Sequence, residues 1–199
     1  MRSKVELADI LHGLGNRVES LELNNWQLRT LSSLSICRTH ALGGHVDACE
    51  ECGVVRVSYN SCRNRHCPKC QGSSREKWIE ARIDELLPVP YFHVVFTIPP
   101  VLNELCMQYP ERLYGLLFKS AWETLHRFAQ NKRLKTGMIA VLHTWGQNLS
   151  FHPHLHCIVP GGGTDKQNKW RNLHADGKFL FPVKAMSKVF RAKYVSILR

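Results

Sequence analysis

The apolar positions in the first part of the chain follow a helical spacing. Leucine and isoleucine side chains recur three or four residues apart over residues 5–36, which predicts a partly amphipathic helical segment. A second helical face spans residues 73–87 and stops before Pro88 and Pro90, because proline cannot continue a helix. We therefore expect helices on both sides of the polar, glycine-rich segment 37–72.

The second half of the chain alternates short apolar runs with longer amphipathic segments. Residues 91–98, 138–143 and 155–159 are apolar runs of strand length bounded by prolines, glycines or polar residues. Residues 110–130 and 184–198 instead carry apolar side chains at helical spacing, the latter in a basic context. A strand, a helix and then two strands indicate an α+β fold, with helices packed on an antiparallel sheet.

Within the polar segment, residues 49–70 contain five of the eight cysteines, spaced Cys49-x2-Cys52-x9-Cys62-x4-Cys67-x2-Cys70. Two C-x-x-C pairs separated by a loop let four thiolates converge on one ion, as in structural zinc sites. We therefore interpret Cys49, Cys52, Cys67 and Cys70 as ligands of a structural zinc. Such a bond network supplies the folding energy that a small, loop-rich segment cannot obtain from a core.

Four more ligand-type residues are interleaved with this set, namely Cys37, His45, Cys62 and His66. They are chemically suited to a second zinc in a cross-braced arrangement. The alternative is that Cys37 is a small buried side chain, while the two histidines form hydrogen bonds or contact phosphate. The sequence leaves both interpretations open.

The first residues, Met-Arg-Ser-Lys-Val-Glu, lack the apolar core of a signal peptide. We therefore expect a cytoplasmic protein, in a reducing compartment where disulfides do not persist and cysteine clusters bind metal. No apolar run approaches the ~20 residues of a membrane-spanning helix, so we expect no membrane partner.

Charge points to a polyanionic partner. Lysine and arginine outnumber aspartate and glutamate by 27 to 16, which gives a formal net charge of +11. This excess favours nucleic acid. A basic run lies within and beside the cysteine segment, so we interpret Arg63, Arg65, Lys69 and Arg75 as DNA-phosphate contacts. The alternative is a basic face that contacts only water.

A second group of candidate metal ligands consists of histidines in the run from Phe151 to Gly163. Residues two apart on a strand share one face, so His154 and His156 are expected on one side and Leu155 in the core. Two imidazoles placed in this way can bind a divalent ion. His152 has the same parity, although Pro153 can interrupt the strand before it. The alternative is local hydrogen bonding.

Two sets of motifs carry a resemblance to a known family. The first set is Leu42-Gly43-Gly44-His45, Cys49-x2-Cys52-Gly53 and Tyr59-Asn60-Ser61-Cys62-Arg63-Asn64-Arg65-His66-Cys67-Pro68-Lys69-Cys70-Gln71. The second set is Pro88-Val89-Pro90-Tyr91-Phe92-His93-Val94-Val95-Phe96-Thr97-Ile98-Pro99, Val141-Leu142-His143-Thr144-Trp145-Gly146 and Phe151-His152-Pro153-His154-Leu155-His156. In this order they resemble the zinc-binding and catalytic domains of rolling-circle insertion-sequence transposases, the family named after insertion sequence ninety-one. The resemblance covers about residues 30–195.

This resemblance implies membership of the HUH (histidine–hydrophobe–histidine) endonucleases, with His154-Leu155-His156 as the matching motif. In that group the motif histidines hold Mg²⁺ or Mn²⁺ and a tyrosine attacks the DNA backbone, leaving a 5′-phosphotyrosine. His152 and His143 are the candidates for a third ligand. The resemblance also implies a helical and zinc-binding domain over 1–88, an HUH-type domain over 89–199, and single-stranded or hairpin transposon ends as the DNA partner.

The sequence departs from the family in its tyrosines. The family carries paired nucleophiles, Tyr-x3-Tyr, downstream of the histidine motif, and this sequence reaches Arg199 without such a pair. Tyr194 follows the motif but matches neither member. We therefore expect the N-terminal portion of a transposase, with an incomplete HUH-type sheet, that binds DNA and metal but does not cut DNA alone.

Two other functions fit parts of the pattern. A non-catalytic, zinc-dependent DNA-binding or regulatory module needs only the cysteine segment. A metal hydrolase with a catalytic zinc on His152, His154 and His156 is disfavoured, because no His-x3-His helix is present and the basic charge suits DNA better than a small neutral substrate. The target sequence cannot be read from the chain, although Trp145 and Trp170 are candidates for stacking on bases.

Overall fold

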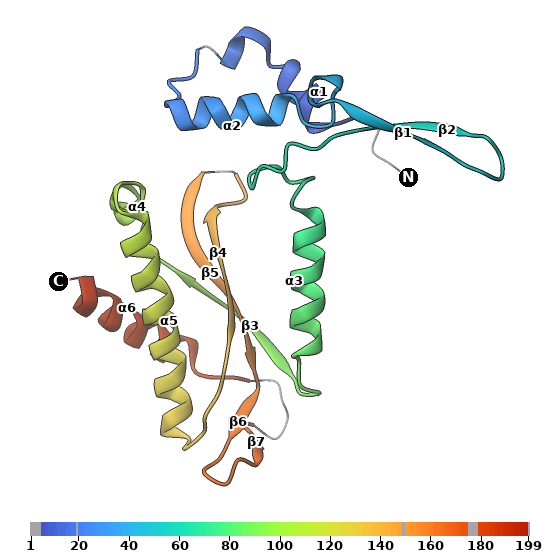
Figure 1. The fold of residues 1–199 in the computed structure, drawn as a ribbon. Coiled ribbons are helices and arrows are strands. Elements are labelled where there is room, and N and C mark those ends of the chain that lie inside the picture. Colours follow the sequence, from blue (N-terminus) through green and yellow to red (C-terminus); the bar gives the residue numbers. More distant parts are fainter. Residues whose placement is uncertain (1–4, 19, 149, 175–178, 199) are drawn as a thin grey trace. The chain divides into compact units, whose positions relative to one another are not determined.

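The computed structural model describes residues 5–18, 20–148, 150–174 and 179–198 and divides the chain into two compact units (Figure 1). The first unit runs through Leu86 and the second begins at Leu87, just before the proline-containing segment that follows the third α-helix. No helix in these described ranges is both long and apolar enough to cross a membrane.

The first unit opens with three short helical pieces, α1 (Leu7–His12), the 3-10 helix η1 (Gly15–Val18) and α2 (Asn25–Ser35). The expected helical segment 5–36 is present as these separate pieces, because local signals interrupt it. Gly15 adopts a φ of 50°, outside the helical region. Asn24 then caps α2: its side chain accepts a hydrogen bond from the Gln27 N–H, and the Gln27 side chain accepts one from the Asn24 N–H.

A two-stranded hairpin and a third helix complete this unit. After the 3-10 turn η2 (His40–Leu42), strand β1 (Gly44–Ala48) pairs antiparallel with β2 (Val55–Tyr59), and α3 (Gly72–Asp84) ends before the expected Pro88 boundary. The small core of the unit consists of Leu34, Cys37 and Cys67, packed against the partly buried Leu7, Leu11, Cys62 and Cys70. The fold of this unit therefore centres on cysteine side chains.

The second unit contains a three-stranded antiparallel sheet in the order β3-β5-β4, formed by β3 (Tyr91–Thr97), β4 (Ile139–Trp145) and β5 (Phe151–Pro160). Strand β5 is central and longer than expected, since it continues through Pro153. This is tolerated because the register shifts between His143 and Trp145, so that Pro153 has no paired residue on β4.

Helices α5 (Pro110–Asn131) and α6 (Val183–Leu198) pack on one face of this sheet (Figure 1). Alternate strand residues, among them Phe96, Leu155 and Cys157, enter the core beneath them. The expected α+β fold, with helices packed on an antiparallel sheet, is confirmed. The sequence pattern missed the short elements, which are the 3-10 turn η3 (Pro100–Leu102), α4 (Asn103–Gln108), and the hairpin of β6 (Gly162–Thr164) and β7 (Trp170–Asn172).

Candidate metal centres

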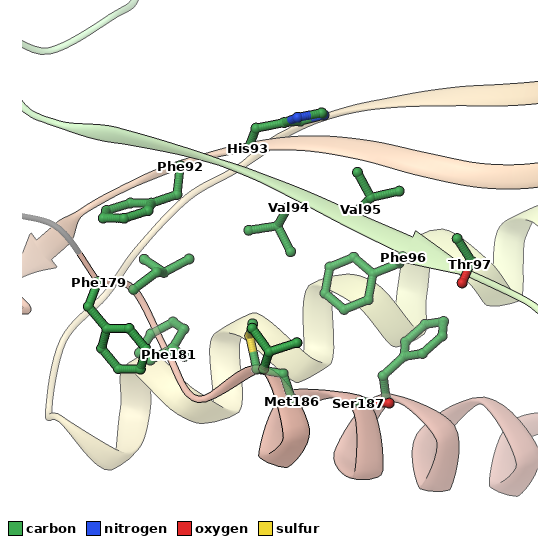
Figure 2. A pocket seen from close by; sticks show the side chains of 13 residues that line it. Phe92, His93, Val94, Val95, Phe96, Thr97, Phe179, Phe181, Met186 and Ser187 are labelled. Carbon is green, nitrogen blue, oxygen red and sulfur yellow. The ribbon is translucent and has the colours of Figure 1, made fainter. Parts of the chain in front are cut away.

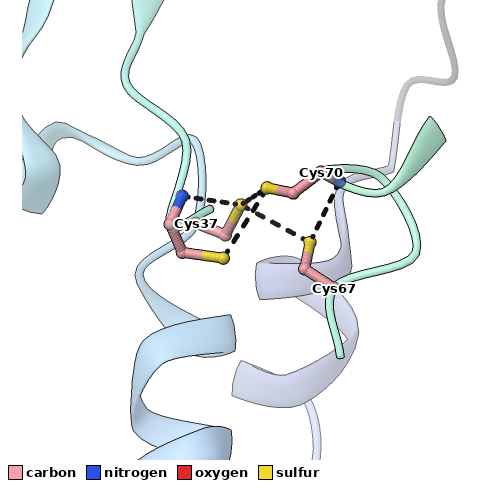
Figure 3. Close-up of side chains that lie close together, drawn as sticks. Cys37, Cys67 and Cys70 are labelled. Atoms are coloured by element: carbon pink, nitrogen blue, oxygen red, sulfur yellow. Dashed lines mark hydrogen bonds between the residues drawn. The ribbon is translucent and has the colours of Figure 1, made fainter. Parts of the chain in front are cut away.

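Four cysteines from three separate segments of the first unit converge (Figure 3). Cys37 follows α2, Cys62 follows β2, and Cys67 and Cys70 lie in the turn that leads into α3. The Sγ of Cys37 is 3.7 Å from that of Cys67 and 3.5 Å from that of Cys70, and the Sγ atoms of Cys62 and Cys70 are 3.7 Å apart. All four sulfurs lie within 4.8 Å of one another.

These sulfur–sulfur distances fit a tetrahedral zinc. With Zn–S bonds of about 2.3 Å, the edges of the tetrahedron are about 3.8 Å long. Backbone N–H groups also point at the sulfurs: Cys62 donates to Cys37 Sγ over 3.5 Å and Asn64 donates to Cys62 Sγ over 3.4 Å. Such donors favour thiolate over thiol. The cluster therefore has both the geometry and the hydrogen bonding of a structural zinc site.

The acidity of the four thiols is unequal. Burial opposes ionisation of Cys70, but hydrogen bonds from Cys67, Cys37 and the Arg63 backbone outweigh it and lower the pKa of Cys70 to about 7. Burial raises the pKa of Cys37 to about 12. A divalent ion would remove this barrier, because its charge favours deprotonated thiolates at every ligand position.

The cluster combines the two expected cysteine sets rather than reproducing either. Cys67 and Cys70 are joined by Cys37 and Cys62, while Cys49 and Cys52 are exposed at the end of the β1–β2 hairpin. The structure does not bring Cys49 and Cys52 to Cys67 and Cys70, because the two strands carry that pair away from the turn. Spacing alone could not reveal this, since the two C-x-x-C pairs look alike in the sequence.

The two histidines of the expected second zinc site lie outside the cluster. His45 is exposed on β1, with its Nε2 3.6 Å from a carboxylate oxygen of Asp47. His66 packs edge-on against Trp26, with ring centroids 4.9 Å apart, and its Nε2 accepts a hydrogen bond from Arg65 Nε over 3.2 Å. Neither belongs to a metal-type group among the described residues.

The four basic residues expected at DNA are all exposed near the cysteine cluster. Arg63 takes a left-handed φ of 51° beside the cluster. Two of the four have acidic partners: Lys69 pairs with Glu6, and Arg75 lies 2.9 Å from a carboxylate oxygen of Glu76. Arg63 and Arg65 have no acidic partner in the described part of the chain.

The second centre is a group of histidines on the sheet face opposite α5 and α6. His154 and His156 project from β5, and His143 lies on β4 directly across from His154. One ring nitrogen from each of the three lies within 4.8 Å of the others, and the two Nε2 atoms of His154 and His156 are 3.0 Å apart. Leu155 between them is fully buried. The expected alternation along this strand is confirmed.

The other ring nitrogen of each motif histidine is held by a neighbour. The Nδ1 of His154 is 2.6 Å from the backbone oxygen of His152, so Nδ1 donates and Nε2 keeps a free lone pair. The Nδ1 of His156 is 2.7 Å from the Nε2 of His93 on β3. Partners of this kind orient metal-binding histidines in known sites. Both Nε2 atoms are therefore directed at the shared point.

The environment keeps His156 neutral. Burial lowers the pKa of His156, and repulsion from His143, His154 and His93 lowers it further. A neutral imidazole is the form that binds metal. The 3.0 Å separation of the two Nε2 atoms also fits, because adjacent corners of an octahedron with metal–ligand bonds of about 2.1 Å are about 3.0 Å apart. The donor set thus suits a six-coordinate divalent ion.

Of the two candidates for the third ligand, His143 lies in the group with His154 and His156, whereas His152 does not. His152 supplies its backbone oxygen to His154, and its ring does not join the three-nitrogen group. His143 joins that group, with its ring stacked on Trp145 at a centroid distance of 5.0 Å. Sequence reasoning missed His93 altogether; its alternation with Phe92 and Val94 on β3 is the signal that places it on the histidine face.

An open hollow of about 450 Å³ is lined by His143, His152, His154 and His156, together with Val95, Thr97, Trp145, Gly146 and Gln147. No tyrosine is among the described residues that line it. Tyr194 lies in the core under the opposite face, where burial raises its pKa to about 12. The hydroxyl of Tyr91 accepts a hydrogen bond from the Leu87 N–H.

A second hollow, of about 440 Å³, lies along β3, at the edge of the sheet (Figure 2). Phe96, Phe181, Met186 and Phe190 make its lining largely apolar. Figure 2 shows His93 pointing away from Phe181 and Met186. Among the described residues that line this hollow, the only titratable group is therefore His93, which also contacts His156.

A four-cysteine cluster in the first unit and a histidine–hydrophobe–histidine motif on the sheet of the second unit define two candidate metal sites. Comparison with known families agrees. Residues 10–98 match the family described as "Transposase zinc-binding domain", and residues 137–199 match the family described as "Putative transposase". The chain therefore belongs to the insertion-sequence transposases that carry this zinc-binding domain.

Two relatives are transposases by name. The protein "Putative transposase y4qJ" of Sinorhizobium fredii is 45% identical over 203 residues, which cover 99% of this chain and 50% of that protein. The "Transposase for insertion sequence element IS801" of Pseudomonas savastanoi pv. phaseolicola is 34% identical over 76% of this chain and 37% of its own length. The chain thus spans half or less of the relatives it matches.

Among solved structures, the metal-bound conjugative relaxase TrwC in complex with oriT DNA aligns with a TM-score of 0.37 and 12% identity, over 53% of this chain and 42% of that one. The metal-free complex aligns with a TM-score of 0.39 and 12% identity, over 55% and 44%. Scores below 0.5 do not establish a common fold, so these similarities carry no weight for function.

Proposed function

We propose that the chain forms the metal- and DNA-binding part of an HUH transposase, which cleaves and rejoins single DNA strands during transposition. The observation that carries this proposal is the histidine centre. Three imidazoles meet on an open sheet face, and the two motif rings are held by neighbours so that both Nε2 atoms converge. Histidines that only stabilise a strand would not need this arrangement.

His154, His156 and His143 would hold Mg²⁺ or Mn²⁺, which would polarise a DNA phosphate and offset the negative charge that develops on its oxygens. Three neutral imidazoles leave the charge of the ion uncompensated, which favours phosphate as a further ligand. The open hollow gives a strand access to this point, and Trp145, 52% exposed, offers a ring on which a base can stack.

Cleavage of this type needs a tyrosine whose oxygen bonds to phosphorus while the P–O bond to the upstream sugar breaks, leaving a 3′-hydroxyl and a 5′-phosphotyrosine. None of the five tyrosines of this chain lines the histidine hollow. Tyr194 in particular faces the core on the other side of the sheet. We therefore assign metal and DNA binding to residues 1–199, with the nucleophile supplied from elsewhere.

In the first unit, we assign the structural zinc to Cys37, Cys62, Cys67 and Cys70. Arg63 and Arg65 lie in the same loop, so zinc would fix the basic side chains that contact DNA phosphates. We infer that the zinc unit supplies phosphate contacts, whereas the histidine centre supplies the contact that depends on the second metal.

The test is binding of fluorescent single-stranded, hairpin and duplex transposon-end DNA, measured by anisotropy with Mn²⁺ or with a chelator too weak to remove the zinc. Mn²⁺ should tighten binding of single-stranded or hairpin DNA to the wild-type chain. The double variant His154→Ala/His156→Ala should lose this increase and keep the metal-free affinity. His12→Ala, which removes an exposed histidine of α1, is the matched control and should behave as wild type.

Mn²⁺-independent binding in the wild type, or an unchanged Mn²⁺ effect in the double variant, would contradict the proposed role of the histidines. DNA binding that depends only on zinc would instead support a zinc-dependent DNA-binding module.

A further inference from the structure

The β1–β2 hairpin forms an arm that extends away from α1 and α2 (Figure 1). Neither strand contains a buried residue, and the two strands pack mainly on each other. A two-stranded hairpin by itself is marginally stable in water, because it buries too little apolar surface. An arm of this kind therefore gains stability from whatever covers it.

One face of this arm is apolar and exposed. Val46 lies opposite Val57, Ala48 opposite Val55, and Gly44 opposite Tyr59. The exposed fractions are 64% for Val46, 56% for Val57 and 46% for Tyr59. The other face carries the polar residues His45, Asp47, Arg56 and Ser58. Such an alternation of apolar and polar residues is typical of a hairpin that buries one face, yet no described residue of the first unit covers this face.

The tip of the arm carries Cys49 and Cys52, both exposed. A tight turn joins them: the Gly53 N–H donates to the Cys49 carbonyl over 2.9 Å, and the Cys49 N–H donates to the Val54 carbonyl over 3.0 Å. Gly53 takes a φ of 66°, which a residue with a side chain rarely adopts. The turn thus presents two thiols three residues apart, which is half of a four-thiolate zinc site.

The other half is missing from the described residues of the chain. No group of three or more metal-type ligands there includes Cys49 or Cys52. The nearest four-cysteine group is complete without them, and Cys106 and Cys157 are buried in the core of the second unit. A structural zinc needs four ligands, so a zinc at this tip would need two further ligands that the described residues do not bring to it.

We propose that two copies of the chain share one zinc ion, bound by Cys49 and Cys52 of each copy. A second identical tip supplies the ligand number and type that the first lacks. The two-fold axis passes through the ion, so the contact is closed and stops at a dimer. With the axis parallel to the arms, the two apolar faces around Val46 and Val57 meet as the tips meet. This proposal does not depend on the function of the histidine centre.

The experiment measures mass by light scattering and zinc content by elemental analysis on the whole chain purified with zinc. The wild type should be a dimer and should hold about one zinc ion per two chains more than the double variant Cys49→Ser/Cys52→Ser. The double variant should be a monomer that retains the zinc of its own cysteine cluster, which also shows that the first unit remains folded. Glu50→Gln, in the same turn, keeps both thiols and should remain a dimer.

A second variant tests the arm face without touching the ligands. Val46→Asp should weaken the dimer at least tenfold, because it places a carboxylate in the covered face. A monomeric wild type, a dimer unaffected by loss of both thiols, or a monomer that holds the extra zinc would each overturn the proposal. A dimer that separates with reductant but resists chelator would show a disulfide instead, and would also overturn it.

Discussion

A histidine can bind a metal ion through one ring nitrogen only when its ring points at the ion. The hydrogen bond made by the other ring nitrogen sets this orientation. In this protein, the backbone oxygen of His152 fixes His154, and the ring of His93 fixes His156. Both contacts use Nδ1 and leave Nε2 free. The metal-binding geometry therefore rests on residues that need not touch the ion.

The clearest test of this dependence is His93. His93→Ala should weaken Mn²⁺ binding by about 10–100-fold, because His156 then loses the acceptor that holds its ring. His93→Gln offers a side-chain oxygen as acceptor and should recover part of the affinity. Titration calorimetry with Mn²⁺ checks both variants. Equal losses in the two would mean that His93 acts through packing rather than through the 2.7 Å hydrogen bond.

His143 and His152 provide a paired comparison at the same centre. His143→Ala removes a ring nitrogen from the group of three and should lower Mn²⁺ affinity at least tenfold. His152→Ala keeps the backbone oxygen that fixes His154 and should lower it much less. The same calorimetry measures the Mn²⁺ affinity of both variants. A larger loss of affinity in His152→Ala than in His143→Ala would indicate that His152, not His143, is the third ligand.

The sequence predicted part of this centre for a simple physical reason. Alternation along one strand places His154 and His156 together and Leu155 inside, and it needs no knowledge of the fold. His143 and His93 lie on other strands, so their position depends on strand register, which a single sequence does not contain. The cysteine cluster was only partly predicted for the same reason. Cys37 lies 25 residues before Cys62 in the sequence, and only the fold brings the two together.

At the scale of elements, α5 and α6 are joined by an ion pair across the core they cover. Lys193 on α6 donates a 2.9 Å hydrogen bond to a carboxylate oxygen of Glu123 on α5. This hydrogen bond is the largest cause of the lowered pKa of Glu123. A carboxyl whose pKa is lower in the folded state stabilises the fold above its ordinary pKa, and this contribution is lost as the pH falls through the lowered value.

Lys193→Gln should therefore lower the free energy of unfolding by less than about 1 kcal/mol at neutral pH, since both groups are partly exposed. The difference from wild type should disappear below about pH 4, where Glu123 becomes protonated in both proteins. Urea unfolding at several pH values measures it, with Lys188→Gln on the same helix as control. A difference that persists in acid would indicate packing of the lysine stem instead.

The cysteine cluster should make the first unit, but not the second, dependent on metal. Its core contains few apolar side chains, whereas the second unit buries a broad set under α5 and α6. Strong chelation should thus expose residues 37–72 to protease and leave the sheet domain protected. Cys37→Ser should have the same effect without chelator. Cys106→Ser is the control from the second core, and equal protection of 37–72 with and without chelator would contradict the zinc assignment.

Element prediction succeeded where apolar periodicity was long and failed where local signals took over. The apolar pattern over 110–130 predicted the bounds of α5 to within one residue, because this long helix has seven buried positions at helical spacing. In the segment 5–36, the Asn24 cap and the backbone of Gly15 outweighed the leucine spacing. The hairpin of β6 and β7 has three-residue strands, too short for alternation to show.

The whole chain combines two kinds of candidate metal site, a four-cysteine group and a three-histidine group, in one basic protein. The four-sulfur cluster suits zinc, and the nitrogen group suits an ion that also accepts phosphate oxygen. The net charge of +11 of the whole chain favours a polyanionic partner. Sulfur ligands in one unit and imidazoles in the other are different donor sets, so the structural zinc and the ion proposed for the histidine centre would be selected by different chemistry.

We expect the histidine centre to bind a divalent ion independently of the zinc site. Electron paramagnetic resonance of Mn²⁺ added to the zinc-loaded chain measures it directly. About one Mn²⁺ should bind per chain, and it should be lost in His154→Ala/His156→Ala with no change in zinc content. Mn²⁺ binding that survives both substitutions, or zinc that leaves the chain when the histidines are replaced, would contradict it.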